Sequence, residues 1–166
     1  MNYTIKHILS RRSCRNFNEN VVLEDDFETI LKCAIYAPTG RNKQNLFFVG
    51  LKDEQKIKKL KEFMGQDYYY GSKYIIFTML RFEDPLTDLN VGAAMENMLI
   101  AADALSYSAC WIHASRTLNT PEGKKFIKEL FSLDKEYEIL DSVALGHSCE
   151  SEVKPLVRNT LHDKII

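Results

Sequence analysis

One long segment, residues 88–104, carries apolar or small side chains on nearly every side of the helix that it predicts. Its apolar residues recur at helical spacing at Val91, Ala94, Met95, Met98, Leu99 and Ala102, and Leu105 continues the pattern directly after the segment. Glycine and alanine narrow much of its surface, at positions 92, 93, 94, 101, 102 and 104. A helix of this composition has to be covered on most sides, and its narrow surface lets another helix approach closely. We therefore expect a central helix packed on most sides, with a second subunit as one candidate partner.

The rest of the chain predicts helices that alternate with strands, with no internal repeat and no linker. Further helices are expected at residues 5–9, 24–35, 54–64 and 121–131, and strands at residues 46–51, 74–80, 109–113 and 139–146. The strands are almost entirely apolar, which is typical of a sheet covered on both faces and indicates three layers. We expect a single domain over residues 1–166. The tail, about 152–166, has few apolar residues and is expected to pack on a partner subunit.

Composition excludes several classes of function. The 22 Lys and Arg balance 23 Asp and Glu, which argues against a nucleic-acid module or a basic membrane-surface helix. No apolar run is long enough to span a bilayer, and the N-terminus lacks a signal-peptide pattern. The four cysteines form no Cys-x-x-Cys pair, so reduced thiols in the cytoplasm are expected rather than a zinc site or a disulfide framework.

The densest candidate site is a basic turn at residues 11–15, directly after the first helix. It contains Arg11, Arg12, Ser13 and Arg15. Guanidinium groups offer planar, paired donors that suit phosphate, and serine adds another donor. The alternative is a surface turn whose arginines pair with Glu19, Glu24 or Asp25. Taken alone, this segment favours the alternative.

Three further segments carry polar groups that could serve a site. The loop at residues 37–45 offers Thr39, Asn42 and Gln44, whose donors and acceptors suit the edge of a heteroaromatic ring or a polyol chain. The alternative is an ordinary loop between a helix and a strand, which has the same composition. His113 ends a predicted strand and could act as an acid or base. No Asp, Glu or second His lies at a telling distance from it in the sequence, so we expect no catalytic dyad. The tail adds a short basic segment around residue 154.

Taken together and in this order, these segments resemble the nitroreductase family of flavin-dependent oxidoreductases. The resemblance covers nearly the whole chain and lies in RRSCRNF (11–17), APTGRNKQ (37–44), ENMLIAA (96–102), CWIH (110–113) and ALGH (144–147), followed by Lys154 and Arg158. Each motif is weak alone, but five in the correct order reverse the balance in favour of function. The resemblance implies an α+β fold, a three-layer α-β-α sandwich with a central mixed or antiparallel sheet, in a homodimer.

The resemblance also implies FMN bound at the dimer interface, with both subunits lining each site. Its phosphate would be held by Arg11, Ser13 and Arg158, more weakly by Lys154, with Arg12 on the ribityl or phosphate side and Arg15 at the N1/O2 edge of the ring. The second subunit would supply Pro38, Thr39, Gly40 and Asn42, with Gln44 supporting that loop or the ring. The backbone around Ile112, His113 and Ala114 would face the N5/O4 edge.

The implied activity is NAD(P)H-dependent reduction of nitroaromatics, quinones or similar small acceptors, by a ping-pong hydride mechanism in which the flavin does the chemistry. No catalytic side chain is required. Two alternatives stay open: an FMN-binding or redox-sensing protein with little turnover, and an interaction domain without a cofactor. The segment between residues 63 and 74 has no insertion long enough to act as a lid, so an open cleft and loose substrate selectivity are expected.

Overall fold

The structure is a computed structural model that describes residues 2–150. Its helices are α1 (Tyr3–Ser10), α2 (Glu24–Ile35), α3 (Glu54–Met64), α4 (Thr87–Ala104) and α5 (Pro121–Phe131), with short 3-10 helices η1 (Gly40–Asn42) and η2 (His113–Leu118). Its strands are β1 (Leu46–Leu51), β2 (Tyr74–Leu80), β3 (Ser108–Ile112) and β4 (Glu138–Gly146). They form one sheet in the order β1-β2-β4-β3, with each neighbouring pair antiparallel.

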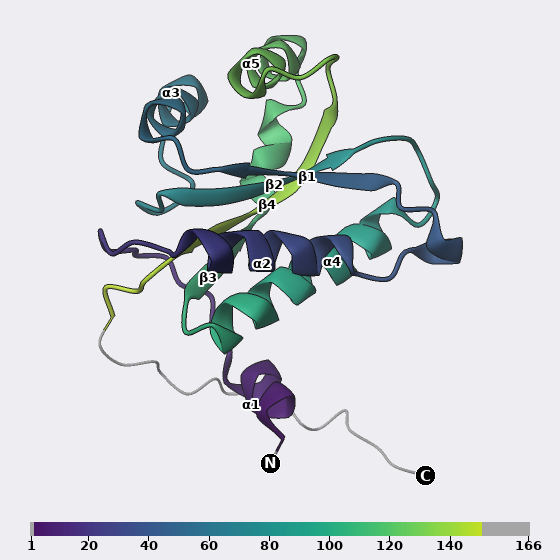
Figure 1. The fold of residues 1–166 in the computed structure, drawn as a ribbon. Helices are drawn as coiled ribbons and strands as arrows, with labels where there is room; N and C mark the ends of the chain where they lie inside the picture. Colours follow the sequence, from purple (N-terminus) through teal and green to yellow (C-terminus); the bar gives the residue numbers. More distant parts are fainter. Residues whose placement is uncertain (1, 151–166) are drawn as a thin grey trace, which may run out of the picture.

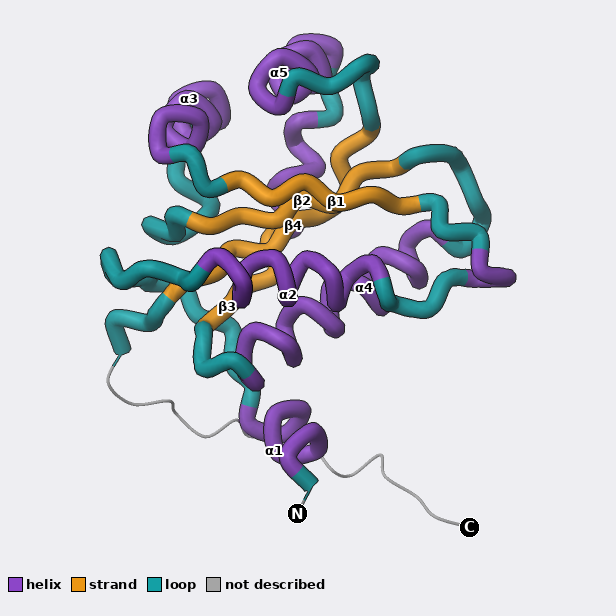
Figure 2. Tube along the Cα trace, in the orientation of Figure 1, coloured by secondary structure: helices purple, strands orange, loops and turns teal. Residues whose placement is uncertain are grey.

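The sheet lies between two layers of helices (Figures 1 and 2). Helices α3 and α5 cover one face, and α2 and α4 cover the other, with α1 beyond α4. Each face has its own apolar core, one around Met95 and Met98 of α4, the other around Ile57 and Leu60 of α3. The inner strands β2 and β4 are buried along almost their whole length because both of their faces are covered. The predicted three-layer α+β fold with an antiparallel sheet is confirmed.

Side-chain caps start two of the helices where the sequence predicts. The Asp53 carboxylate accepts a hydrogen bond from the backbone N–H of Lys56 at 2.9 Å and caps α3. The Thr120 hydroxyl accepts from the N–H of Gly123 at 3.0 Å, with Pro121 at the first position of α5. These caps also fix where the preceding loops end.

The strand predicted at residues 109–113 differs at its end. β3 stops at Ile112, and His113 is the first residue of η2. The apolar run through residue 112 predicts the strand correctly. The turn into η2 is associated with a buried carboxylate on β4, which the sequence does not indicate and which is described below.

Helix α4 is the central helix that its composition predicts. It packs against α2 and the sheet, and its inward stripe from Val91 to Ala102 is buried. Its far side is less covered, and Leu89 is 71% exposed. Among residues 2–150, no helix is both long and apolar enough to cross a membrane.

Candidate functional site

The basic turn lies along the outer edge of β3. Ser13 forms an isolated parallel bridge with Ala109, and the N–H of Cys14 donates to the Ala109 carbonyl at 2.9 Å. Since β3 pairs with β4 on its other side, these two contacts place the turn on the edge that β4 leaves open. The side chains of Ser13 and Arg15 are exposed there.

Each arginine of the turn has a different environment. The Nε of Arg11 lies 3.4 Å from Oε1 of Glu96 on α4, and it is buried without a hydrogen bond. Arg12 donates to the carbonyls of its own turn, at 2.7 Å to Ser10 and 2.7 Å to Arg11. Within residues 2–150, Arg15 has no hydrogen bond or ion pair.

The carboxylates of the surface-turn alternative are largely engaged elsewhere. Glu24 on α2 pairs with Lys52, and Glu19 pairs with Lys73. The latter pairing, together with Glu54, raises the pKa of Lys73 above its ordinary value. Two of the three proposed partners are therefore paired with lysines, which leaves donors of the basic turn available for a ligand.

The second predicted segment, around η1, is held at the beginning of α4. The N–H of Gly40 donates to Oδ1 of Asn90 at 3.0 Å. A Cβ added to Gly40 would lie 2.3 Å from a methyl carbon of Leu86, so only glycine fits against that side chain as it stands. This close approach explains the glycine in APTGRNKQ.

Three non-glycine residues of this loop have left-handed backbones. The φ angle is 54° at Arg41, 53° at Asn42 and 50° at Gln44. Such conformations are uncommon in non-glycine residues and cluster at ligand-binding sites. The Gln44 amide donates to Oδ1 of Asn42 at 3.2 Å, and the Gln44 N–H donates to the Thr39 hydroxyl at 3.0 Å. The loop is thus ordered by its own polar groups, while Pro38 and Asn42 stay exposed.

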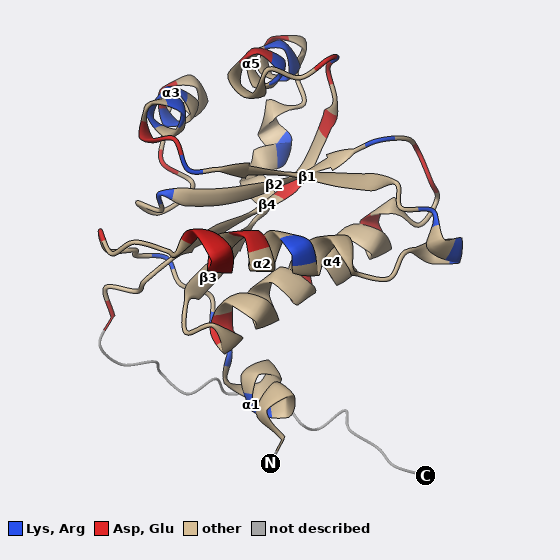
Figure 3. Ribbon diagram, viewed as in Figure 1, with Lys and Arg blue, Asp and Glu red and all other residues tan. Residues whose placement is uncertain are grey.

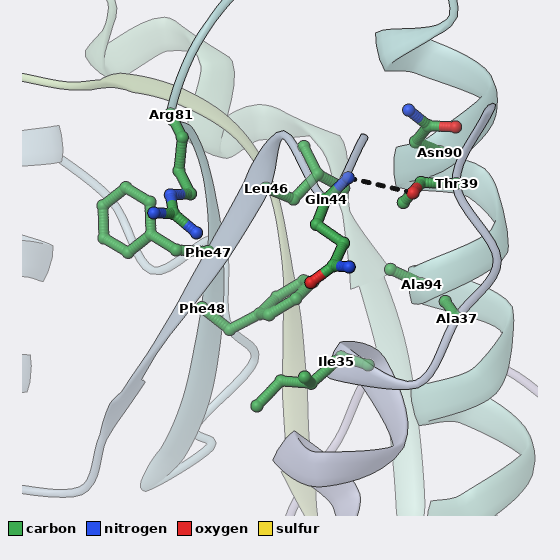
Figure 4. A pocket seen from close by; sticks show the side chains of 11 residues that line it. Ile35, Ala37, Thr39, Gln44, Leu46, Phe47, Phe48, Arg81, Asn90 and Ala94 are labelled. Atoms are coloured by element: carbon green, nitrogen blue, oxygen red, sulfur yellow. Dashed lines mark hydrogen bonds between the residues drawn. The ribbon is translucent and has the colours of Figure 1, made fainter. Parts of the chain in front are cut away.

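A pocket of about 260 Å³ opens between this loop, α2, β1 and α4 (Figure 4). Thr39 and Gln44 line it together with Phe48, Asn90 and Arg81, of which the last two are not indicated by the sequence. Its volume lies below the range of about 300–1,000 Å³ that is typical of ligand pockets. Within one chain it is therefore too small for a cofactor of the size of FMN.

The structure separates the two predicted halves of the site along α4. The η1 loop is bonded to Asn90, near the first turn of α4. His7, just before the basic turn, is bonded to Asp103 in the last turn at 2.8 Å. These two positions are about 20 Å apart at the helical rise of about 1.5 Å per residue, and Figure 1 shows α1 and η1 near opposite ends of the helix. One chain does not bring the two halves together.

The end of β3 carries a polar cluster that the sequence analysis missed. The Asp141 side chain on β4 is 3% exposed, and its carboxylate accepts from Nε1 of Trp111 at 2.9 Å and from Nε of Arg116 at 3.1 Å. Nδ1 of His113 lies 2.9 Å from the same carboxylate. The sequence shows no acidic partner for His113 because that partner lies 28 residues away in the chain, on the neighbouring strand. An acidic residue inside an otherwise apolar strand is the one signal that could have found it.

Arg116 connects this cluster to the beginning of α4. Its Nη2 donates to Oδ1 of Asp88 at 2.9 Å. Burial of the guanidinium opposes its charge, but hydrogen bonds to Asp88 and Asp141 outweigh burial and raise the pKa of Arg116 above its ordinary value. Arg116 therefore remains a cation that holds η2 against both β4 and α4.

The remaining predicted residues are either covered by the protein or lie outside the described part of the chain. Ile112 is buried at the end of β3, and Ala114 is partly buried in η2. Lys154 and Arg158 lie outside the described residues, as does the tail that was expected to pack on a partner. The four cysteines are free, and burial raises the pKa of the Cys110 thiol.

Residues 8–73 and 80–147 match the sequence profile of the nitroreductase family. The two matched ranges contain the basic turn, the η1 loop and the end of β3, and they cover most of the chain. This chain belongs to the nitroreductase family. The family assignment predicted from the motifs is therefore confirmed.

Individual proteins that are similar to this chain agree with the family assignment. A protein of Archaeoglobus fulgidus that is assigned by name to the NADH dehydrogenases/NAD(P)H nitroreductases is 28% identical over 89% of this chain and 86% of its own length. The NADPH-flavin oxidoreductase of Vibrio harveyi is 25% identical over 93% of this chain and 70% of its own length. A solved nitroreductase with bound FMN from Bacteroides fragilis covers 100% of both chains with a TM-score of 0.90 at 22% identity, which shows that the fold is shared.

Proposed function

We propose that this protein is an FMN-dependent oxidoreductase that uses NADH or NADPH to reduce small acceptors such as nitroaromatics and quinones. Membership of the nitroreductase family supports the reaction class, and the names of the relatives from V. harveyi and A. fulgidus support the cofactor and the reductants. When bound, FMN supplies the hydride chemistry, taking a hydride from NAD(P)H and passing it to the acceptor in separate half-reactions. The protein's own residues bind the cofactor and orient it toward NAD(P)H and the acceptor.

The observation that carries the proposal is the set of donors left open on the edge of β3. The Arg11 Nε is buried without a hydrogen bond and lies 3.4 Å from Glu96, and Ser13 and Arg15 of the same turn are exposed. A phosphate dianion is held well by about two or three charge-assisted partners, so this set fits the FMN phosphate. We assign Arg11, Ser13 and Arg158 to the phosphate with Lys154 in support, Arg12 to the ribityl side, and Arg15 to the electron-rich N1/O2 edge of the ring.

A second copy of the chain completes the site. The η1 loop is too far along α4 to reach the basic turn of its own chain, so Pro38, Thr39, Gly40 and Asn42 serve the partner's cofactor, supported by Gln44. The arrangement requires α4 to pack against the partner's α4 in the opposite direction. Ile112, His113 and Ala114 then line the N5/O4 edge with their backbone.

Exposed apolar side chains support this homodimer. No residue of α1 is buried in the core. Its apolar side chains are all exposed: Tyr3, Ile5, Ile8 and Leu9. Leu89 on α4 is also exposed. Figure 3 shows charged residues on α2, α3 and α5, while most of α4 is uncharged. Burial of these side chains against a partner would stabilise the dimer by about 25 cal/mol for each Å² of apolar surface that is removed from water.

Spectroscopy tests the proposal directly. Purified protein should be yellow, or turn yellow with added FMN, and the flavin absorbance should bleach anaerobically with NADH or NADPH. Arg15→Ala should weaken FMN binding or lower its reduction potential, because a fixed cation beside N1 favours the reduced ring, whereas Lys58→Ala on the exposed face of α3 should change neither. A protein that ignores added FMN overturns the proposal, and one that binds FMN without bleaching is a binding or sensing protein.

A further inference from the structure

We propose that His113 is the proton donor to the acceptor, and that Asp141 is the positioning residue that orients it. This role rests on the proposed function, because it places the acceptor beside the end of β3. It is carried by the geometry of one buried carboxylate and one exposed imidazole, which the family resemblance does not indicate.

Asp141 fixes which nitrogen of His113 carries the proton. Its carboxylate already accepts from the indole N–H of Trp111 and the Nε–H of Arg116, so it acts as an acceptor on both oxygens. The Nδ1 of His113, 2.9 Å from Oδ1, must therefore donate. Nε2 then points away from the carboxylate, and it makes no hydrogen bond to any other residue between 2 and 150.

The pair differs sharply in exposure. The His113 side chain is 76% exposed, while that of Asp141 is 3% exposed. A buried carboxylate is rigid because it is packed and bonded to three donors, and an exposed ring is open to a substrate. The indole N–H of Trp111 donates to the same carboxylate, and Trp111 is 38% exposed, so it also leaves part of an apolar ring open to solvent. The arrangement suits a planar aromatic acceptor with an oxygen at its edge.

The charges around His113 come from three elements. β4 contributes Asp141, η2 contributes Arg116, and the beginning of α4 contributes Asp88 through its ion pair with Arg116. With a neutral imidazole these groups sum to one negative charge, and with a protonated imidazole they sum to zero. The cluster therefore accommodates both forms of the ring without leaving an unpaired buried charge.

The proton step balances for a quinone. A quinone that takes up one hydride becomes the anion of a hydroquinone, with the negative charge on oxygen. The Nε2–H bond of protonated His113 breaks, its electron pair stays on the ring nitrogen, and an O–H bond forms on the acceptor. The ring is left neutral with its Nδ1–H still on Asp141, and water returns the proton.

Comparing two acceptors isolates this step. Ferricyanide takes electrons without a proton, so the ratio of the two rates isolates the proton step. In His113→Gln the rate with benzoquinone should fall about 100-fold relative to the rate with ferricyanide, which is the lower end of the range for general acid catalysis. The rate of benzoquinone reduction should fall by a similar factor in His113→Ala, and it should recover when imidazole is added. His147→Gln replaces a histidine bonded elsewhere, to the Val21 carbonyl, and should leave both rates unchanged.

The outcomes separate the two proposals. Wild-type protein that oxidises NAD(P)H with neither acceptor overturns the proposed function, and this role with it. Wild-type turnover combined with an unchanged benzoquinone rate in His113→Gln overturns the role of His113 alone. An equal loss with both acceptors also overturns it, because a structural defect does not distinguish them.

A measurement without cofactor tests the positioning by Asp141. Nitrogen-15 NMR of the apoprotein should show the neutral His113 ring protonated on Nδ1 in the wild type. Asp141→Asn, which keeps the shape of the side chain, should give a mixture of tautomers and a partial loss of benzoquinone reduction, with the ferricyanide rate retained. A wild-type ring protonated on Nε2 overturns the proposal.

Discussion

Asp67 shows how a single carboxylate orders a turn next to the core. Its oxygens accept from the N–H of Tyr69 at 2.8 Å and from that of Gly71 at 2.9 Å, and Lys61 Nζ lies 2.8 Å away. These bonds hold a turn in which Tyr70 has a φ of 55°, and they fix Tyr69 with its ring fully buried. The Tyr69 hydroxyl reaches 3.1 Å from Ser115, and burial raises its pKa to about 12.

Replacing this carboxylate should give a pH-dependent loss of stability. Burial raises the pKa of Asp67, but hydrogen bonds from Lys61 and the two N–H groups outweigh it and leave the pKa below its ordinary 3.8. Because the folded pKa is depressed, the stabilisation is present above about pH 4 and is lost as the pH falls through the folded value. Asp67→Asn should lower the free energy of unfolding by about 1 kcal/mol at pH 7 and by less at pH 2, measured by urea denaturation.

Lys61→Met serves as the matched control, since it removes only the partly exposed ion pair and should cost less than Asp67→Asn. A difference between wild type and Asp67→Asn that stays constant from pH 7 to pH 2 would contradict this explanation.

Single residues are also where the sequence was least informative. The basic turn was found because Arg11, Arg12 and Arg15 are neighbours in the chain. The Asp141 cluster was missed because its donors come from β3 and η2, and only strand pairing brings them to β4. Long-range contacts of this kind depend on register, which no local spacing predicts.

At the scale of elements, α5 is fixed to η2 by one glycine. A Cβ on Gly123 would lie 2.3 Å from the Leu118 carbonyl oxygen, a backbone atom that cannot rotate away. Gly123→Ala should therefore lower the free energy of unfolding by about 2 kcal/mol or more, although alanine favours a helix by about 1 kcal/mol. In Gly92→Ala on α4 the nearest atom would be a Trp111 ring carbon at 4.0 Å, so thermal unfolding should shift little. Equal effects of the two changes would exclude the close approach as the cause.

Most element boundaries followed from local patterns. The cap at Asp53 and the Thr120-Pro121 start mark α3 and α5, and the apolar run at Leu46–Leu51 coincides with β1. The six residues of the 3-10 helix η2 have no apolar period of their own, so the local pattern predicts only the strand that precedes them. The hydrogen bonds of η2 go to Asp141 and Asp88 instead, which are remote in sequence.

For the whole molecule, the apolar surface of α1 and α4 predicts an obligate pair. Ile5→Glu or Leu89→Glu should shift the protein toward monomers in sedimentation experiments and weaken FMN binding in parallel, because the proposed site needs residues from both chains. Phe63→Glu on α3, which is 44% exposed on the opposite helical layer, should leave association unchanged. Monomers that keep full FMN affinity would contradict the shared site.

The separation of the two half-sites by the length of α4 has a genetic consequence. In a hybrid of one Arg15→Ala copy and one Asn42→Ala copy, one of the two clefts combines both lesions and the other contains neither. Random pairing of the two defective forms should thus restore about a quarter of the normal clefts, so cells that express both alleles should regain flavin-loaded protein that neither allele yields by itself.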